Sequence, residues 1–231
     1  MRWLDSAWPQ VLDLTVSHLA IALPAIALSV VLAVPLGFLA HRRRRLHGPL
    51  LALLGILYAI PSLPLLIMIP AAIGTGLRSP INMVLALTLY GIAILVRQVS
   101  DAFDAVPSDT LESADAAGFG PWRRFWQVEL PLAAPVIASG ARVVVVSTIS
   151  LVTVGAVIGV HSLGTLFTDG FQRGLPAEVL TGLVGTLVLA LILDGLTVLL
   201  TRLVTPWTHP GGSSPAIGDL PPGSAPEEAV A

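Results

Sequence analysis

The sequence predicts an all-α membrane protein with about five spanning helices, an external N-terminus and a cytoplasmic C-terminus. Hydrophobic residues make up 55% of the chain and charged residues 11%, whereas soluble domains carry roughly 25% charged residues. Several apolar stretches are almost free of charge, and the arginines are distributed unevenly between the segments that separate them. Lipid is therefore the expected solvent for most of the chain.

Five stretches are long and apolar enough to cross the hydrocarbon layer, which takes about 20 residues of helix. They are residues 19–40, 50–69, 81–96, 134–158 and 180–203. The third is the shortest, and the segment 71–80 supplies an external turn before it. Together they define an expected transmembrane domain over residues 19–205.

The two ends are expected to lie outside this domain. Residues 1–18 are expected to form an extracytoplasmic segment that is retained, because the first apolar run is too long for a signal peptide and no small-residue cleavage site follows it. Residues 206–231 are rich in Pro, Gly and Ser. They have no apolar period and are expected to form a disordered cytoplasmic tail.

The arginines predict the orientation, because loops rich in arginine stay on the cytoplasmic side. All 12 basic residues are arginine, and four of them, Arg42 to Arg45, directly follow the first span. An external N-terminus places nine on or near the cytoplasmic side: Arg42, Arg43, Arg44, Arg45, Arg97, Arg123, Arg124, Arg142 and Arg202. The other three, Arg2, Arg78 and Arg173, are then external.

Composition disfavours several classes of function. A net charge of -2 without a concentrated basic face argues against nucleic-acid binding. The chain has no cysteine and its five histidines lack ligand spacing, so no metal site is expected. No paired carboxylates or nucleophile with a base are evident, which argues against an enzyme. No Gly-rich phosphate loop of the Walker type is found, so the chain is expected to bind no cofactor and any ATP must be hydrolysed elsewhere.

Prolines are expected to interrupt two of the spans. Pro24 and Pro35 lie in the first, and Pro61 and Pro64 lie in the second. A proline removes a backbone donor, and the carbonyl that loses its partner needs a neighbouring helix or a wet cavity. The run from Ile60 to Pro64 is therefore predicted to be a broken helix whose Pro61, Ser62 and Pro64 face a pathway or another helix. The alternative is a simple packing kink.

A polar segment, residues 99–133, separates the third and fourth spans and is long enough to be structured. A helix is expected after Pro107, with Ser108 or Asp109 as its N-cap. Gly118 and Gly120 are expected to end it, and Pro121 to open a second helix. The sequence therefore predicts a helix, a sharp glycine turn and a helix.

The second of these helices is predicted to have an aromatic face. Trp122 and Trp126 are four residues apart with Phe125 beside them, while Arg123 and its polar neighbours take the other face. Such a helix can lie on the bilayer surface and present the glycine turn to a partner.

The same segment resembles the EAA loop of ABC importer permeases. That pattern is E-A-A, three residues, G, nine residues, then I-x-L-P. Here Glu112-Ser113-Ala114 precedes Gly118 at this spacing, and Val128-Glu129-Leu130-Pro131 follows after nine residues. Ser113 and Val128 are the two departures, and both are small changes.

Further segments are similar to the osmoprotectant permeases for glycine betaine, carnitine and choline. They are Val34-Pro35-Leu36-Gly37, Ile60-Pro61-Ser62-Leu63-Pro64, Ile158-Gly159-Val160 and Leu163-Gly164. The resemblance implies a type I ABC importer fold, like that of the methionine permeases, in a bacterial inner membrane. It also implies three partners: a cytoplasmic ABC ATPase dimer, a second permease chain and an extracytoplasmic substrate-binding protein.

The resemblance implies that the segment couples ATPase closure to the helices. The expected coupling residues are Glu112, Ala114, Gly118, Leu130 and Pro131. Glu112 would pair with a basic or amide group of the ATPase, or would be a solvated acid at a helix start. Gly118 would permit the tight docking turn, or would be a C-cap without a partner contact.

Asp194 lies near the middle of the fifth span, where an unpaired carboxylate is costly. We expect it to be neutralised or partnered, by a cationic solute or, more commonly, by another helix or the second permease. Arg142 is expected to extend its head to the cytoplasmic face. Only Phe38, Tyr58, Tyr90 and Phe167 lie in or near spans, too few to predict an aromatic cage for a quaternary ammonium.

The expected function is import of a small osmoprotectant such as glycine betaine, choline, carnitine or proline betaine. The nearest alternative is a permease for methionine or another small amino acid or amine, and the solute held by the binding protein distinguishes the two. A membrane enzyme and a non-transporting scaffold are further alternatives, of which the scaffold needs no ATPase-docking turn.

Overall fold

A computed structural model describes residues 2–208, and the residues that it describes form helices, turns and no strands. The N-terminal and middle helices are α1 (Arg2–Arg42), α2 (Arg44–Ala59), α3 (Ser62–Ile73), α4 (Pro80–Asp104), α5 (Ser108–Ala116) and α6 (Pro121–Arg124). They are followed by the π-helix η1 (Phe125–Glu129), α7 (Leu130–Val154), the 3-10 turn η2 (Gly155–Ile158), α8 (Thr165–Arg173), α9 (Pro176–Val204) and the 3-10 turn η3 (Pro206–Thr208).

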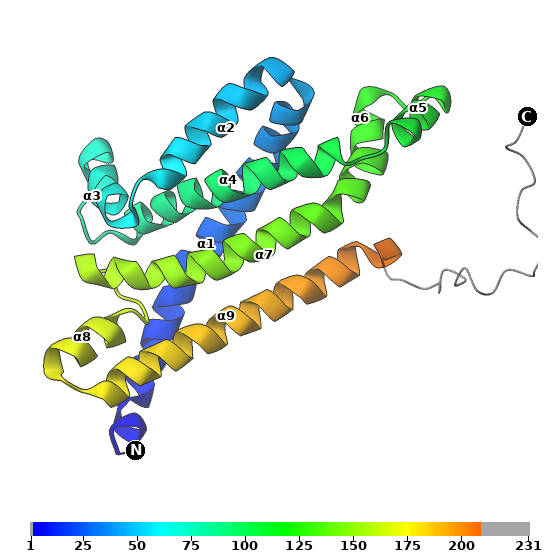
Figure 1. Cartoon of the computed structure of the whole chain (residues 1–231). Coiled ribbons are helices and arrows are strands. Elements are labelled where there is room, and N and C mark those ends of the chain that lie inside the picture. The colour runs from blue at the N-terminus through cyan, green and yellow to red at the C-terminus, as the bar shows by residue number, and fades with distance from the viewer. Residues whose placement is uncertain (1, 209–231) are drawn as a thin grey trace, which may run out of the picture.

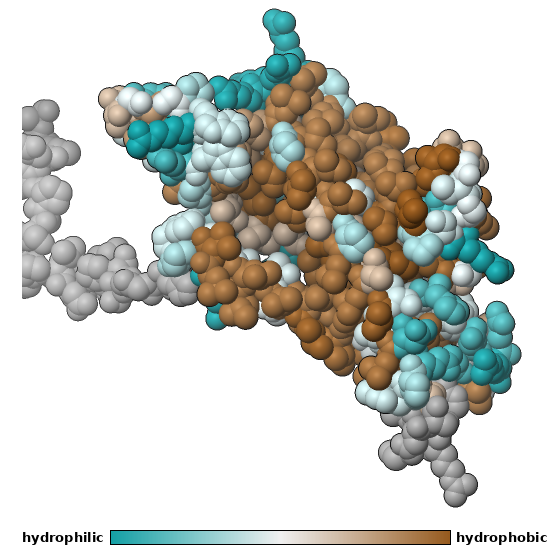
Figure 2. Space-filling model, turned by 180° about the vertical axis from the view of Figure 1, so that it is seen from behind, coloured by the Kyte–Doolittle hydropathy of each residue, from teal (hydrophilic) through white to brown (hydrophobic). Residues whose placement is uncertain are grey.

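Within residues 2–208, four helices are each long and apolar enough to cross a membrane, and the bent pair α2 and α3 makes up to five. This agrees with the prediction of about five spans. Figure 1 shows α4, α7 and α9 side by side, with α1 crossing behind them. Figure 2 shows a broad apolar band with hydrophilic residues gathered towards its two ends, the pattern expected of a chain solvated by lipid in its middle.

Helix α1 is longer than predicted. The predicted external segment 1–18 continues the first span as one helix from Arg2 onward. Ala7, Val11 and Leu14 are buried at helical spacing, which explains why this part is helical although its charges lower its hydropathy. The prediction that Pro24 and Pro35 interrupt the span is wrong, because both lie inside the continuous helix.

The predicted span 50–69 is two helices rather than one. The chain bends by 104° between α2 and α3, around Ile60 and Pro61. Helix α3 has 12 residues and extends about 18 Å, well short of the roughly 30 Å hydrocarbon layer. The predicted break is therefore confirmed, and the predicted span consists of two helices joined at a sharp bend.

Helix α4 is the central helix of the fold, and 61% of its most apolar stretch is buried. It packs against α1 on one side and α7 on the other. The predicted third span ended at residue 96, but the helix continues to Asp104, because Val99, Ala102 and Phe103 extend its buried face. By contrast, only 6% of the corresponding stretch of α9 is buried.

Helices α1 and α4 approach closely at Gly91. A Cβ placed on Gly91 would overlap both side-chain heavy atoms of Ser29. The Ser29 hydroxyl cannot move away freely, since it donates to the carbonyl of Ala25 at 2.7 Å. Small residues at such positions allow helix backbones to pack closely in lipid.

We therefore expect Gly91→Ala to destabilise the chain by about 1–3 kcal/mol, the usual cost of overpacking. The measurement is the thermal unfolding midpoint of the purified protein in detergent. Gly55→Ala is the matched control, because a Cβ at Gly55 meets no atom within 4 Å. Equal midpoints for the two variants would contradict the packing argument.

The contacts separate the polar segments into two ends of the molecule. At one end, Arg42 and Arg43 lie near Pro121 and Trp122, and His41 contacts Asp104 at 2.7 Å. At the other end, Arg78 lies beside Gly159 and the first residues of α8. The arginine run and the predicted helix–turn–helix thus share one end, as predicted. The predicted tail begins with η3, and its residues 209–231 lie outside the described part of the chain.

Candidate functional site

The segment that carries the EAA-like residues lies between α4 and α7, over residues 105–129. It is shorter than the predicted polar segment 99–133, because α4 and α7 take up both of its ends. Helices α5 and α6 project from one end of the long helices (Figure 1). We refer to residues 105–129 as the 105–129 segment.

The start of α5 differs by one residue from the prediction. Pro107 is the N-cap residue, with φ −60° and ψ 132°, and no side chain caps the helix. Ser108 and Asp109 are therefore the first helical residues rather than the N-cap. Proline favours this start because its ring fixes φ. Asp109 in the first turn still complements the helix dipole.

Gly118 ends α5 in the left-handed conformation, with φ +80°. Its N–H donates to the carbonyl of Asp115 at 3.0 Å, and the N–H of Phe119 donates to the carbonyl of Ala114 at 3.1 Å. These two bonds are the Schellman motif, which satisfies carbonyls left free at a helix end. The predicted glycine turn is confirmed, and glycine is favoured there by the backbone angle, because a Cβ would meet no atom within 4 Å.

Arg124 joins the two halves of the 105–129 segment. Its Nη1 lies 2.6 Å from Oδ2 of Asp115 on α5, and its Nε lies 2.7 Å from Oε1 of Glu129 on η1. Glu129 is 5% exposed, whereas Asp115 is exposed. Sequence patterns did not signal these ion pairs, since partners nine and five residues away match no regular helical spacing.

Replacing Arg124 with methionine is expected to loosen the segment. The buried Glu129 carboxylate would lose its charged partner, a change that costs about 1–3 kcal/mol. We expect faster amide hydrogen exchange over residues 108–129. Arg123→Met is the control, because Arg123 is exposed and contacts Gln127 and the Phe119 ring. Unchanged exchange in the Arg124 variant would contradict a clamping role.

Leu130 and Pro131 mark the junction between η1 and α7. The N–H of Leu130 donates to the carbonyl of Phe125, the five-residue spacing of a π-helix. Pro131 has no N–H, and its ring would clash with a carbonyl four residues earlier in a regular α-helix. The wider π-turn before Pro131 accommodates that ring.

Three phenylalanines connect the segment to the long helices. The ring centroid of Phe125 on η1 lies 4.5 Å from the ring centroid of Phe38 on α1 and 5.9 Å from that of Phe103 on α4. Phe38 and Phe103 contact each other at 5.0 Å. A displacement of η1 would therefore displace α1 and α4 as well, because close-packed groups transmit strain. The sequence did not predict this cluster, because its members come from three different elements.

The remaining EAA-like residues have different environments. Glu112 is exposed, and Ala114 is buried, with 7% of its surface exposed. Glu112 on α5 and the glycine turn at the end of α5 are thus both exposed. The inner side, including Ala114, packs against the segment itself.

The broken helix between α2 and α3 is held by α4. In a regular helix the carbonyl of Ile60 would accept the N–H of residue 64, but residue 64 is proline. Oη of Tyr90 on α4 donates to this carbonyl at 2.5 Å. The predicted need for a neighbouring helix is met in this way. Pro61 and Pro64 are exposed and Ser62 is partly buried.

Tyr58 lies beside this break. Its ring is 6.0 Å from that of Tyr90, in an edge-to-face arrangement. Tyr58 is 55% exposed, while Tyr90 is 5% exposed. The broken helix is a separate site from the 105–129 segment. Helix α4 contacts both sites.

Asp194 on α9 is paired with Arg142 on α7. Two parallel hydrogen bonds of 2.7 Å join Nε and Nη2 of Arg142 to the two carboxylate oxygens. The expectation that Asp194 is partnered is confirmed. The expectation that Arg142 extends to the cytoplasmic face is wrong, because its guanidinium is held by Asp194 at the α7–α9 contact.

Two buried polar side chains were not predicted as site residues. His18 on α1 and Glu178 near the start of α9 are fully buried; the His18 imidazole faces the backbone of Ile149 on α7, and the Glu178 carboxylate has no hydrogen-bond partner within the described residues. Arg173 lies 3.9 Å from Glu178 and supplies a nearby positive charge. Among residues 2–208, no group of three or more His, Cys, Asp or Glu side chains is arranged to hold a metal ion.

Comparison with known proteins gives consistent results. The family model described as the binding-protein-dependent transport system inner membrane component matches residues 25–206. The osmoprotectant import permease protein OsmW of Salmonella typhimurium is 35% identical, over 84% of this chain and 91% of its own length. The glycine betaine/carnitine/choline transport system permease protein OpuCB of Bacillus subtilis is 30% identical, over 89% of this chain and 94% of its own length.

A solved structure of the same architecture is the inward-facing MetNI methionine ABC transporter. One of its chains superposes with a TM-score of 0.76 and 23% identity, covering 85% of this chain and 97% of that one. At this identity the likeness shows the fold alone. It confirms the predicted type I importer architecture.

Proposed function

Because this chain belongs to the family of binding-protein-dependent transport system inner membrane components, we propose that it imports a small osmoprotectant such as glycine betaine, choline, carnitine or proline betaine. In this proposal it works with an ATPase dimer, a second permease chain and an extracytoplasmic binding protein. It forms the translocation pathway and leaves ATP hydrolysis to the ATPase. The named functions of OsmW and OpuCB support the class of solute.

The observation that carries the coupling role is the construction of the 105–129 segment. Its outer side presents Glu112 and the turn at Gly118, both of which are exposed. Its inner side is tied to α1 and α4 through Phe38, Phe103 and Phe125. A segment that is exposed outside and firmly packed inside is suited to convert docking of a partner into movement of helices.

We propose that the break between α2 and α3 borders the pathway. Irregular backbone at membrane depth is tolerated where it is buried in protein or lines a wet cavity. Pro61, Ser62 and Pro64 bring such backbone to the surface of this chain, and Tyr58 adds an exposed aromatic ring beside it. An aromatic face attracts a quaternary ammonium. Tyr58 therefore favours a betaine-like solute.

The test is uptake of radiolabelled solutes by cells that express this chain with its ATPase and binding protein. We expect ATP-dependent uptake of at least one of glycine betaine, choline, carnitine and proline betaine. Unlabelled methionine in excess is expected to leave that uptake unchanged. Tyr58→Ala should lower uptake more than Tyr58→Phe, since phenylalanine keeps the aromatic face.

Three outcomes would count against parts of this proposal. Uptake of methionine alone would show that the chain serves an importer of methionine rather than of an osmoprotectant. No uptake of any small amine or amino acid by an assembled complex would remove the transport function. Equal uptake by the two Tyr58 variants would show that the Tyr58 ring does not contact the solute in the pathway.

A further inference from the structure

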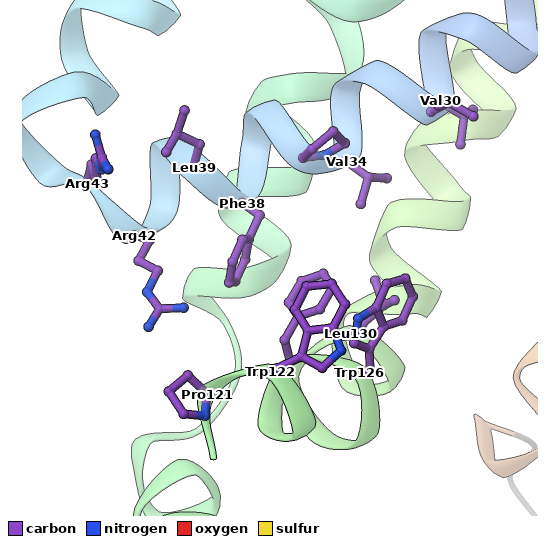
Figure 3. A pocket seen from close by; sticks show the side chains of 13 residues that line it. Val30, Val34, Phe38, Leu39, Arg42, Arg43, Pro121, Trp122, Trp126 and Leu130 are labelled. Atoms are coloured by element: carbon purple, nitrogen blue, oxygen red, sulfur yellow. The ribbon is translucent and has the colours of Figure 1, made fainter. Parts of the chain in front are cut away.

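A groove lies between the last part of α1 and the aromatic limb of the 105–129 segment. Its volume is about 1160 Å³, above the roughly 300–1,000 Å³ of ordinary small-molecule sites. Figure 3 shows Val30, Val34 and Phe38 on the α1 side, facing Trp122 and Trp126 across the groove. These tryptophans were predicted to lie on the bilayer surface, and the groove was not predicted.

The groove matches one leaflet of the membrane in length. The distance from Val30 to Arg42 along α1 is about 18 Å, and half of the hydrocarbon layer is about 15 Å. The lining is apolar over most of this distance, and Arg42 and Arg43 lie at one end. Trp122 and Trp126 are 75% and 51% exposed, as expected for rings at the depth of the headgroups.

The two arginines at the end of the groove are not neutralised within the described chain. No carboxylate of the described residues lies within 4.0 Å of the guanidinium of Arg42 or Arg43. Arg42 instead lies 5.8 Å from the Phe38 ring, which belongs to the groove wall. By contrast, Arg124 on the opposite side is held by two carboxylates. The groove therefore combines an apolar body with positive charge at one end.

We propose that this groove binds one anionic phospholipid of the cytoplasmic leaflet. The acyl chains lie against Val30, Val34 and the two tryptophans, and the phosphate lies near Arg42 and Arg43. Each basic residue near the membrane surface adds attraction for an anionic headgroup. A helix of a second protein chain would fit the apolar body but would leave the arginines without an anionic partner.

The site would connect the surrounding lipid to the coupling machinery. Trp122 and Trp126 belong to the limb that carries Phe125, and Phe125 packs against Phe38. A lipid in the groove touches both sides of that contact. It would hold the 105–129 segment against α1.

Tryptophan quenching by brominated lipids tests the proposal in the full-length chain in nanodiscs. Replacing Trp3, Trp8 and Trp207 with phenylalanine leaves only the two groove tryptophans. We expect brominated phosphatidylglycerol to reach half-maximal quenching at a mole fraction about fivefold or more below that of brominated phosphatidylcholine, since each basic residue near an anionic headgroup contributes about a factor of five. Arg42→Gln/Arg43→Gln should abolish this preference, and Arg42→Lys/Arg43→Lys should keep it.

Arg44→Gln/Arg45→Gln is the matched control, because it removes the same charge from adjacent residues that do not line the groove. Arg44 lines a separate cavity with His41, His47 and Asp104. This control should keep the preference for phosphatidylglycerol. If both double variants lost the preference for phosphatidylglycerol, the lipid would be attracted by a diffuse basic surface rather than by the groove. That result would overturn the proposal. Equal quenching by the two lipids, or quenching by neither because a second chain covers the groove, would also overturn it.

Discussion

Replacing Gly118 with valine is expected to reduce solute uptake by about tenfold or more while the protein remains inserted in the membrane. Gly118 has φ +80°, and the left-handed conformation costs an ordinary residue about 1–2 kcal/mol, with a larger penalty for a β-branched side chain. Since about 1.4 kcal/mol is a factor of ten, the docking turn would be only a minor conformation. Uptake and ATPase activity of the reconstituted complex are the measurements.

The neighbouring glycine provides a matched control. Gly120 has φ −67°, which every residue can adopt, and a Cβ added to either glycine would meet no atom within 4 Å. Gly120→Ala should therefore transport normally, and Gly118→Ala should be impaired. Gly118→Asn should retain more activity than Gly118→Ala, because asparagine tolerates the left-handed region. Normal uptake by Gly118→Val would show that the turn does not couple the subunits.

Replacing Asp194 with alanine is expected to remove most of the correctly folded protein from the membrane. The variant leaves the Arg142 guanidinium without its two 2.7 Å hydrogen bonds in a helix of the membrane-spanning domain. An unpaired charge at that depth is costly, and breaking a pair by removing one partner is worse than replacing both. The measurement is the yield of monodisperse protein by fluorescence-detected size-exclusion chromatography.

The double variant Asp194→Leu/Arg142→Met separates a structural pair from a pathway residue. If the pair only joins α7 to α9, the double variant should recover the yield and transport normally. Recovery of the yield without transport would assign the carboxylate a direct role in solute passage. Failure of the double variant to recover would contradict the view that the unpaired charge causes the loss.

Local signals in the 105–129 segment explain why its form was predictable. Pro107, Gly118 and Pro121 each restrict or permit particular backbone angles, and these restrictions depend little on distant residues. The helix, the turn and the start of the second helix therefore appear where expected, with an error of one residue at the N-cap. The Arg124 ion pairs and the Phe125 contacts required the folded chain, because their partners lie on other elements or at irregular spacing.

Proline had opposite effects in two helices. Pro61 breaks the second span, whereas Pro24 and Pro35 lie inside an unbroken α1. The sequence cannot distinguish these outcomes, because the residue that satisfies or supports the freed backbone belongs to another helix. At the break that residue is Tyr90 of α4, 30 positions away.

The amino-acid sequence alone determined the class of protein, the approximate number of spans, the glycine turn and the family resemblance. These depend on hydropathy, charge and backbone preference, which act over a few residues. Only the tertiary structure paired Arg142 with Asp194, joined Phe125 to Phe38 and Phe103, and formed the groove between α1 and the tryptophans. Such contacts join residues far apart in the chain, and close packing of whole helices decides which side chains meet.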